Sequence, residues 1–184
     1  MLTFPSERPD NAPVFLWSLQ RRLLQEAEAR LGPGDSGKEI FQPTFSDTGP
    51  HVVNTPNLDG AFATLSRNAA GFWPTSLYEL AHETIHLLNP TVGGTIVLEE
   101  GVAETFALEM AASLGGQIII SSLQSYTDAC NAVKKLAADV FGAAKTVREK
   151  CGALSGATLQ ELSLLFPEVD TALLEELSAS FQRE

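Results

Sequence analysis

The chain has 184 residues, of which 44% are hydrophobic and 19% charged, a composition typical of one globular domain, residues 1–184, and not of a disordered or fibrous protein. Its formal net charge is −11, and its lysines and arginines form no broad basic run, which argues against a nucleic-acid or anionic-membrane partner. No apolar stretch is long enough to span a bilayer. The N-terminal segment lacks the basic and then apolar layout of a secretory signal, so a cytoplasmic location is expected.

The first third of the chain is expected to form one helix and then short strands. Apolar residues recur at helical spacing after Pro13, which predicts an amphipathic helix over residues 13–31. Between residues 40 and 66, short apolar runs separated by Pro, Gly and Asn predict strands. The last of these strands is expected over residues 61–66.

The next segment is expected to be a capped helix. Thr75 or Ser76 can cap it, because Ser76 and Glu79 match the capping box, in which the two side chains satisfy backbone N–H groups at the start of a helix. This helix is predicted to run through residue 88 and to stop at Asn89-Pro90. A second helix is predicted over residues 97–114, after a Gly93-Gly94 turn. From Ile118 onward the chain is expected to be mainly helical, with segments at residues 123–141, 143–150, 159–165 and 171–181.

The most informative motif is His82-Glu83-Thr84-Ile85-His86, which matches His-Glu-x-x-His and lies inside the predicted capped helix. Four residues are a little more than one helical turn, so both imidazoles project from one face and can reach a single ion. Imidazole and carboxylate groups are good zinc ligands, and a catalytic zinc has three protein ligands and one open position. The sequence therefore predicts one Zn²⁺ per chain, bound by His82 and His86.

The third ligand is expected from the following helix, where Glu99, Glu100 and Glu104 bring carboxylates back after the glycine turn. Thirteen residues separate His86 from Glu100. Glu100 and Glu104 are one turn apart, so if Glu100 binds the ion, Glu104 can accept a hydrogen bond from a ligand imidazole. The alternative is that these glutamates form a solvated acidic first turn, favoured by the helix dipole.

The segment Glu100-Gly-Val-Ala-Glu104 behind a His-Glu-x-x-His helix resembles the gluzincin metallopeptidases, the thermolysin-like and related group. The resemblance covers residues 76–106. It implies that Glu100 is the third zinc ligand and that Glu104 supports a histidine ligand, whereas a ligand at Glu104 would leave Leu108 in the supporting position. The spacing between the second histidine and Glu100 is shorter than in the larger gluzincins, and Glu99 is a further alternative.

The resemblance also implies an α+β, zincin-like fold. A small mixed or antiparallel sheet would pack on the metal-binding helix and the glutamate helix, and a helical C-terminal part would follow. Residues 61–66 would be the edge strand that pairs with an extended substrate. Glu83 is expected to be the general base that takes a proton from a zinc-activated water. Candidates for stabilising the oxyanion or contacting the substrate are Tyr78, His51 and Tyr126.

The predicted function is hydrolysis of peptide bonds in a peptide or protein substrate, in the manner of a regulatory protease with a narrow protein target. The alternative is a zinc-containing binding or regulatory module without catalysis. An exposed cleft beside residues 61–66 would favour the enzyme, and a covered one would favour the module.

Overall fold

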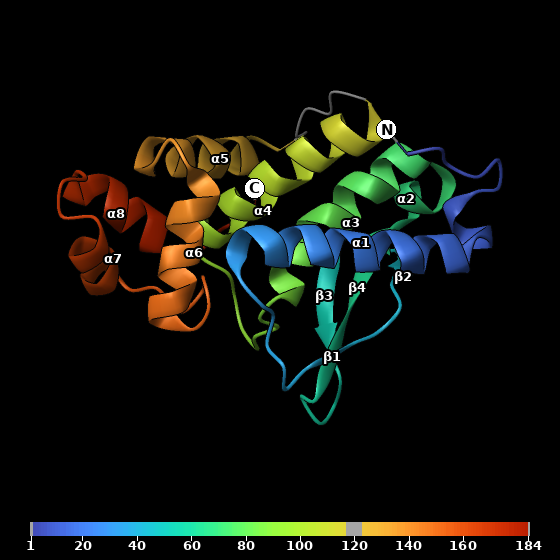
Figure 1. Cartoon of the computed structure of the whole chain (residues 1–184), viewed down its shortest axis with the longest axis horizontal. Coiled ribbons are helices and arrows are strands. Elements are labelled where there is room, and N and C mark those ends of the chain that lie inside the picture. Colours follow the sequence, from blue (N-terminus) through green and yellow to red (C-terminus); the bar gives the residue numbers. More distant parts are fainter. Residues whose placement is uncertain (1, 117–122, 184) are drawn as a thin grey trace. The chain divides into compact units, whose positions relative to one another are not determined.

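A computed structural model of the chain describes residues 2–116 and 123–183 (Figure 1). The chain forms two compact units. The first comprises Met1–Ala29, Pro33–Thr91 and Phe106–Ile120, and the second comprises Arg30–Gly32, Val92–Thr105 and Ser121–Glu184. Helices dominate the described residues, and none of these helices is long and apolar enough to cross a membrane.

The first unit begins with a short 3-10 turn, η1 (Pro9–Asn11), and a long helix, α1 (Pro13–Leu31), whose bounds agree with the predicted ones. The helix forms because its apolar residues recur three and four positions apart, which gives it one continuous buried face. The fully buried residues of that face are Leu16, Leu19, Leu23, Ala27 and Leu31.

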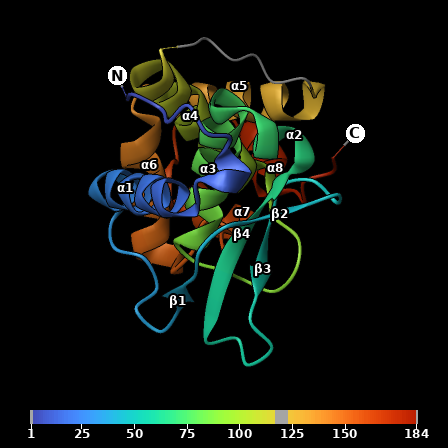
Figure 2. The same ribbon diagram turned by 90° about the vertical axis from the view of Figure 1, so that its right-hand side faces the viewer.

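Four short strands form the mixed sheet that the sequence predicted, and all belong to the first unit (Figure 2). They are β1 (Glu39–Ile40), β2 (Thr44–Ser46), β3 (His51–Asn54) and β4 (Gly60–Ser66). Strands β1 and β2 pair with β4 in parallel, at different positions along it, and β3 pairs with β4 antiparallel. Strand β4 is therefore the centre of the sheet.

The prediction that residues 61–66 form an edge strand is wrong, because β4 has hydrogen-bonded neighbours on both sides. Both faces of β4 are buried: Ala61 and Ala63 lie on one face, and Thr64 lies on the other. Burial of both faces is typical of a central strand. Among the described strands, β3 pairs with β4 alone.

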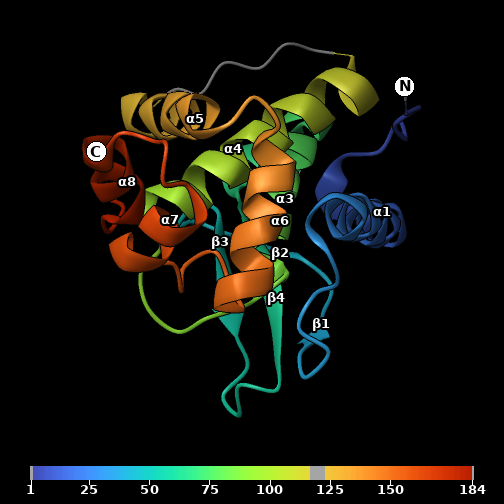
Figure 3. The same ribbon diagram turned by 60° about the vertical axis from the view of Figure 1, so that its left-hand side comes forward.

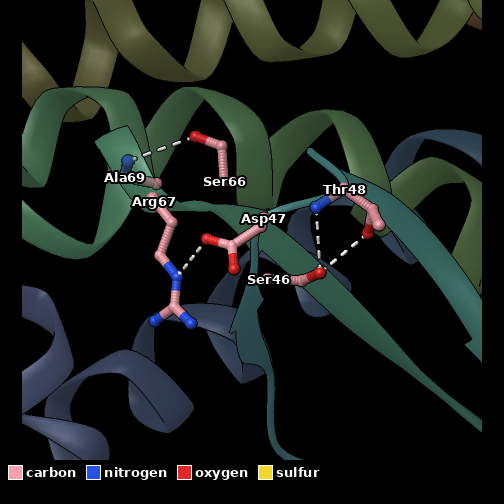
Figure 4. Close-up of polar contacts among 6 residues, drawn as sticks. All are labelled: Ser46, Asp47, Thr48, Ser66, Arg67 and Ala69. Atoms are coloured by element: carbon pink, nitrogen blue, oxygen red, sulfur yellow. Dashed lines mark hydrogen bonds and ion pairs between the residues drawn. The ribbon is translucent and has the colours of Figure 1, made fainter.

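A tight corner connects β4 to the helices that follow it. Ser66 ends β4 and caps the short helix α2 (Arg67–Gly71), because its Oγ accepts the N–H of Ala69 at 3.2 Å (Figure 4). The same serine donates from its backbone N–H and its hydroxyl to the two carboxylate oxygens of Glu79, at 2.8 and 2.6 Å. On the exposed side of the corner, Arg67 forms an ion pair with Asp47 at 2.7 Å (Figure 4).

The helix that carries the His-Glu-x-x-His motif is α3 (Trp73–Leu87). It starts three residues before Ser76, with Pro74 in its first turn. The predicted capping box is wrong, since Ser76 lies inside the helix and its hydroxyl donates to the carbonyl of Ala69 at 2.6 Å. Glu79 does not cap the helix either, because its carboxylate accepts the two hydrogen bonds from Ser66. Proline is favoured in the first helical turn, which explains the earlier start.

The following helix, α4 (Val97–Met110), ends in a single wide π-helical turn, η2 (Ala111–Gly115), close to the predicted range. Residues 98–107 are all buried. By its contacts, α4 belongs to the second unit as far as Thr105 and to the first from Phe106 onward.

The rest of the second unit is helical, as expected, with α5 (Gln124–Leu136), α6 (Val140–Cys151), α7 (Leu159–Leu165) and α8 (Thr171–Ser178) in contact one with the next or with α5 (Figure 3). The single helix predicted over residues 123–141 is two helices, because the Asp139 carboxylate accepts the N–H of Gly142 and starts α6. Residues 118–122, expected to open the helical part, lie outside the described residues.

The chain beyond α8 folds back on the segment that precedes α4, also within the second unit. Ile96 and Ser180 form an antiparallel bridge. On either side of it, the N–H of Val97 donates to the carbonyl of Ala179 at 3.0 Å, and the N–H of Phe181 donates to the carbonyl of Thr95 at 2.9 Å. We call residues 179–181 the C-terminal strap.

Candidate metal centre

The two motif histidines lie in the second half of α3, four residues apart. His82 is 7% exposed and His86 is half-buried. Their ring centroids are 5.2 Å apart. This is the arrangement that one turn of a regular helix imposes on side chains at positions i and i+4, so the predicted pairing of the two imidazoles is confirmed.

His82, His86 and Glu100 each offer one ligand atom, and these atoms all lie within 4.8 Å of one another. A tetrahedral site with zinc–ligand bonds of 2.0–2.2 Å separates its ligand atoms by about 3.4 Å. Two nitrogens and one carboxylate oxygen suit zinc and leave a fourth position open, so the residues present fit the predicted ion, and the group can hold a metal.

Glu100 is the acid in this group, in preference to the two alternatives on the same helix. The alternative of a solvated acidic turn is wrong, because Glu99, Glu100 and Glu104 are only 5%, 6% and 1% exposed. Burying a carboxylate is costly unless it is hydrogen-bonded or paired with a cation. The burial of three carboxylates within two turns of one helix therefore favours a function for their negative charge, such as binding a cation.

Thr95 is a hydrogen-bond partner of the Glu100 carboxylate. Its hydroxyl Oγ1 donates to Oε1 of Glu100 at 2.6 Å. The sequence reasoning missed this residue. A threonine shortly before a predicted helix suggests a cap for the helix backbone at most. The one feature that could have pointed to contact with Glu100 was the place of Thr95 between the glycine turn and the acidic helix.

Glu83, the predicted base, follows His82 on α3 and is 4% exposed. The neighbouring Thr84 is fully buried, and its hydroxyl donates to the Leu80 carbonyl at 2.6 Å within the helix. The motif therefore combines buried ionisable groups with a threonine whose role is structural.

The three candidates for contacting the oxyanion or the substrate have different surroundings. Tyr78 is half-buried on α3, one turn before His82. His51 is exposed at the start of β3, and its Nδ1 lies 3.0 Å from the Gly49 carbonyl oxygen. Tyr126 lies on α5, and its ring packs on Phe181 of the C-terminal strap with centroids 5.1 Å apart. A catalytic role for any of the three stays a prediction.

Gly101 follows the candidate ligand and has a structural explanation within the second unit. A Cβ at this position would overlap the carbonyl group of Ala129 and approach Cγ1 of Val133 to 2.6 Å, both on α5. The backbone of α5 therefore packs directly on the helical turn that carries Glu100. The glycine of the Glu-Gly-x-Ala pattern permits this close approach.

Comparison of the chain with protein-family models, with curated proteins and with solved structures gave no match.

Proposed function

We propose that this chain is a zinc-dependent metallopeptidase with a zincin-like domain, in which His82, His86 and Glu100 bind the metal and Glu83 is the general base. The observation that carries the proposal is the convergence of the three ligand atoms within 4.8 Å, from residues that the His-Glu-x-x-His motif and the downstream glutamate single out. The donor set fits zinc and leaves one position for water or substrate.

Each residue has a defined task under this proposal. The two neutral imidazoles and the Glu100 carboxylate would hold a zinc ion, which when bound lowers the pKa of water toward neutrality and polarises a carbonyl group. Glu83, next to His82 in the chain, would accept the proton from the attacking water and deliver it to the leaving amine. Its low exposure, 4%, would limit exchange of that proton with bulk water.

Strand β3 is the candidate for binding an extended substrate, in place of the covered β4. The hydrogen bond from the Thr55 N–H to the Gly60 carbonyl sets the phase of the β3–β4 ladder. In an antiparallel ladder the main-chain groups of alternate residues point to opposite sides. The N–H and C=O of Val52 therefore point away from β4, where they would be available to pair with a peptide backbone.

The experiment is a comparison of Glu83→Gln with the wild-type chain, after both are loaded with zinc. We expect the variant to keep about one zinc per chain, because it loses no ligand, while cleavage of a peptide library falls by about a thousandfold or more. Glu175→Gln, the same chemical change at an exposed site on α8, is the matched control and should cleave like the wild type. Equal cleavage by the Glu83 variant would refute the assigned base.

One observation favours the alternative, a zinc-containing module without catalysis. Strand β4 has other strands paired with it on both sides, which is closer to the covered arrangement expected of that module. The same experiment separates the two functions. A wild-type chain that binds one zinc ion and cleaves no peptide in the library, with Glu83→Gln indistinguishable from it, would support the module.

A further inference from the structure

We propose that Thr95 is a positioning residue of the metal centre, which fixes the direction of the Glu100 carboxylate. The inference rests on the proposed metal ligand and goes beyond it, because it assigns a role to a residue outside the motif. The observation is the hydrogen bond of 2.6 Å from the Thr95 hydroxyl to Oε1 of Glu100.

The hydrogen bond between Thr95 and Glu100 is short and charge-assisted. A hydroxyl that donates to a carboxylate forms a short, charge-assisted bond, and 2.6 Å lies in the range for such bonds. Glu100 is 6% exposed, so water competes little for its oxygens.

Thr95 is itself held firmly by its backbone. Its carbonyl accepts the N–H of Phe181, and the next two residues are joined to the C-terminal strap by the Ile96–Ser180 bridge and by the bond from Val97 to Ala179. A β-branched side chain has few rotamers once its backbone is fixed. The direction of the hydroxyl is therefore set by a segment more than 80 residues further along the chain.

The consequence is an effect on metal affinity, because the direction of the carboxylate decides how well it can meet the ion. Partners that orient a ligand typically contribute about 10- to 100-fold in metal affinity.

The test measures zinc affinity by competition with a chromogenic chelator, on chains that also have their metal-free thermal unfolding recorded. Thr95→Val removes the hydroxyl and keeps the shape, and Thr95→Ser keeps the hydroxyl. Thr105→Val is the matched control, because Thr105 is a buried threonine of α4 whose hydroxyl donates to the backbone carbonyl of Gly101 and not to a carboxylate.

We expect zinc binding about tenfold weaker or more in Thr95→Val, and within about threefold of the wild type in Thr95→Ser and Thr105→Val. Wild-type affinity in Thr95→Val, or an equal loss in Thr95→Ser or Thr105→Val, would overturn the role of Thr95 and leave the proposed function intact. A wild-type chain that binds no zinc would instead overturn the proposed function, and this inference with it.

Discussion

The two helices that carry the candidate ligands obtain their geometry in different ways. Helix α3 supplies two imidazoles whose separation follows from four residues of regular helix. Helix α4 supplies one carboxylate, and its direction depends on Thr95 and therefore on the C-terminal strap. The place of that turn of α4 in the second unit depends further on close packing of α5 against Gly101.

The difference indicates which ligands should be affected by substitutions elsewhere in the chain. The separation of the two histidines along α3 is set by the helix itself. A change in the strap or at the α4–α5 contact can move the carboxylate while both units stay folded.

Removal of the carboxylate ligand should have the largest effect. Glu100→Ala is expected to weaken zinc binding by about a thousandfold or more, because a three-ligand site loses a ligand. Glu104→Ala should weaken it by about 10- to 100-fold, the effect typical of a supporting residue. Chelator competition measures both. A greater loss in Glu104→Ala would exchange the two assignments.

Gly101→Ala should destabilise the fold by about 1–3 kcal/mol, because its methyl group would overlap the Ala129 carbonyl group on α5. Zinc affinity should also fall, since the adjacent Glu100 must move. Gly94→Ala is the control, because a Cβ there would have no neighbour within 4 Å. Denaturant unfolding measures the stability of both variants. Similar unfolding of the two would refute the close packing.

A chain that ends at Ser178 lacks the strap and should bind zinc about tenfold more weakly. It loses two backbone hydrogen bonds to the segment around Thr95, each worth about 0.5–1.5 kcal/mol. Phe181→Ala in the full chain is the control, because it loses the ring and keeps the backbone bond. Chelator competition should give near wild-type affinity for this control. Full affinity in the shortened chain would show that Thr95 is held without the strap.

On the α3 side, Ser66→Ala should lower the free energy of unfolding by about 1 kcal/mol or slightly more, because it removes a helix cap and a bond to the buried Glu79. Zinc affinity should stay within about twofold. Ser46→Ala, which removes an exposed hydroxyl bonded to Thr48 (Figure 4), should change stability by less than about 0.5 kcal/mol. A loss of zinc affinity in Ser66→Ala would contradict the independence of α3.

Several elements could be predicted from the sequence because their signals are local. The bounds of α1 follow from apolar spacing, and the bounds of α7 agree with the predicted residues 159–165. The start of α3 was mistaken because Ser76 and Glu79 have the right spacing for a capping box, yet each finds a partner near the β4–α2 corner. The order of the strands was beyond local signals, since β4 pairs with all three strands that precede it, two in parallel and one antiparallel.

The sequence by itself determined the pair of imidazoles, because helical periodicity places residues 82 and 86 on one face wherever the helix lies. The sequence also limited the candidates for the third ligand to Glu99, Glu100 and Glu104. Only the tertiary structure decided which of these glutamates joins the group, that β4 is covered, and that a threonine holds the carboxylate. The physical reason is that burial, strand pairing and side-chain hydrogen bonds depend on residues brought together by folding, which no spacing along the chain encodes.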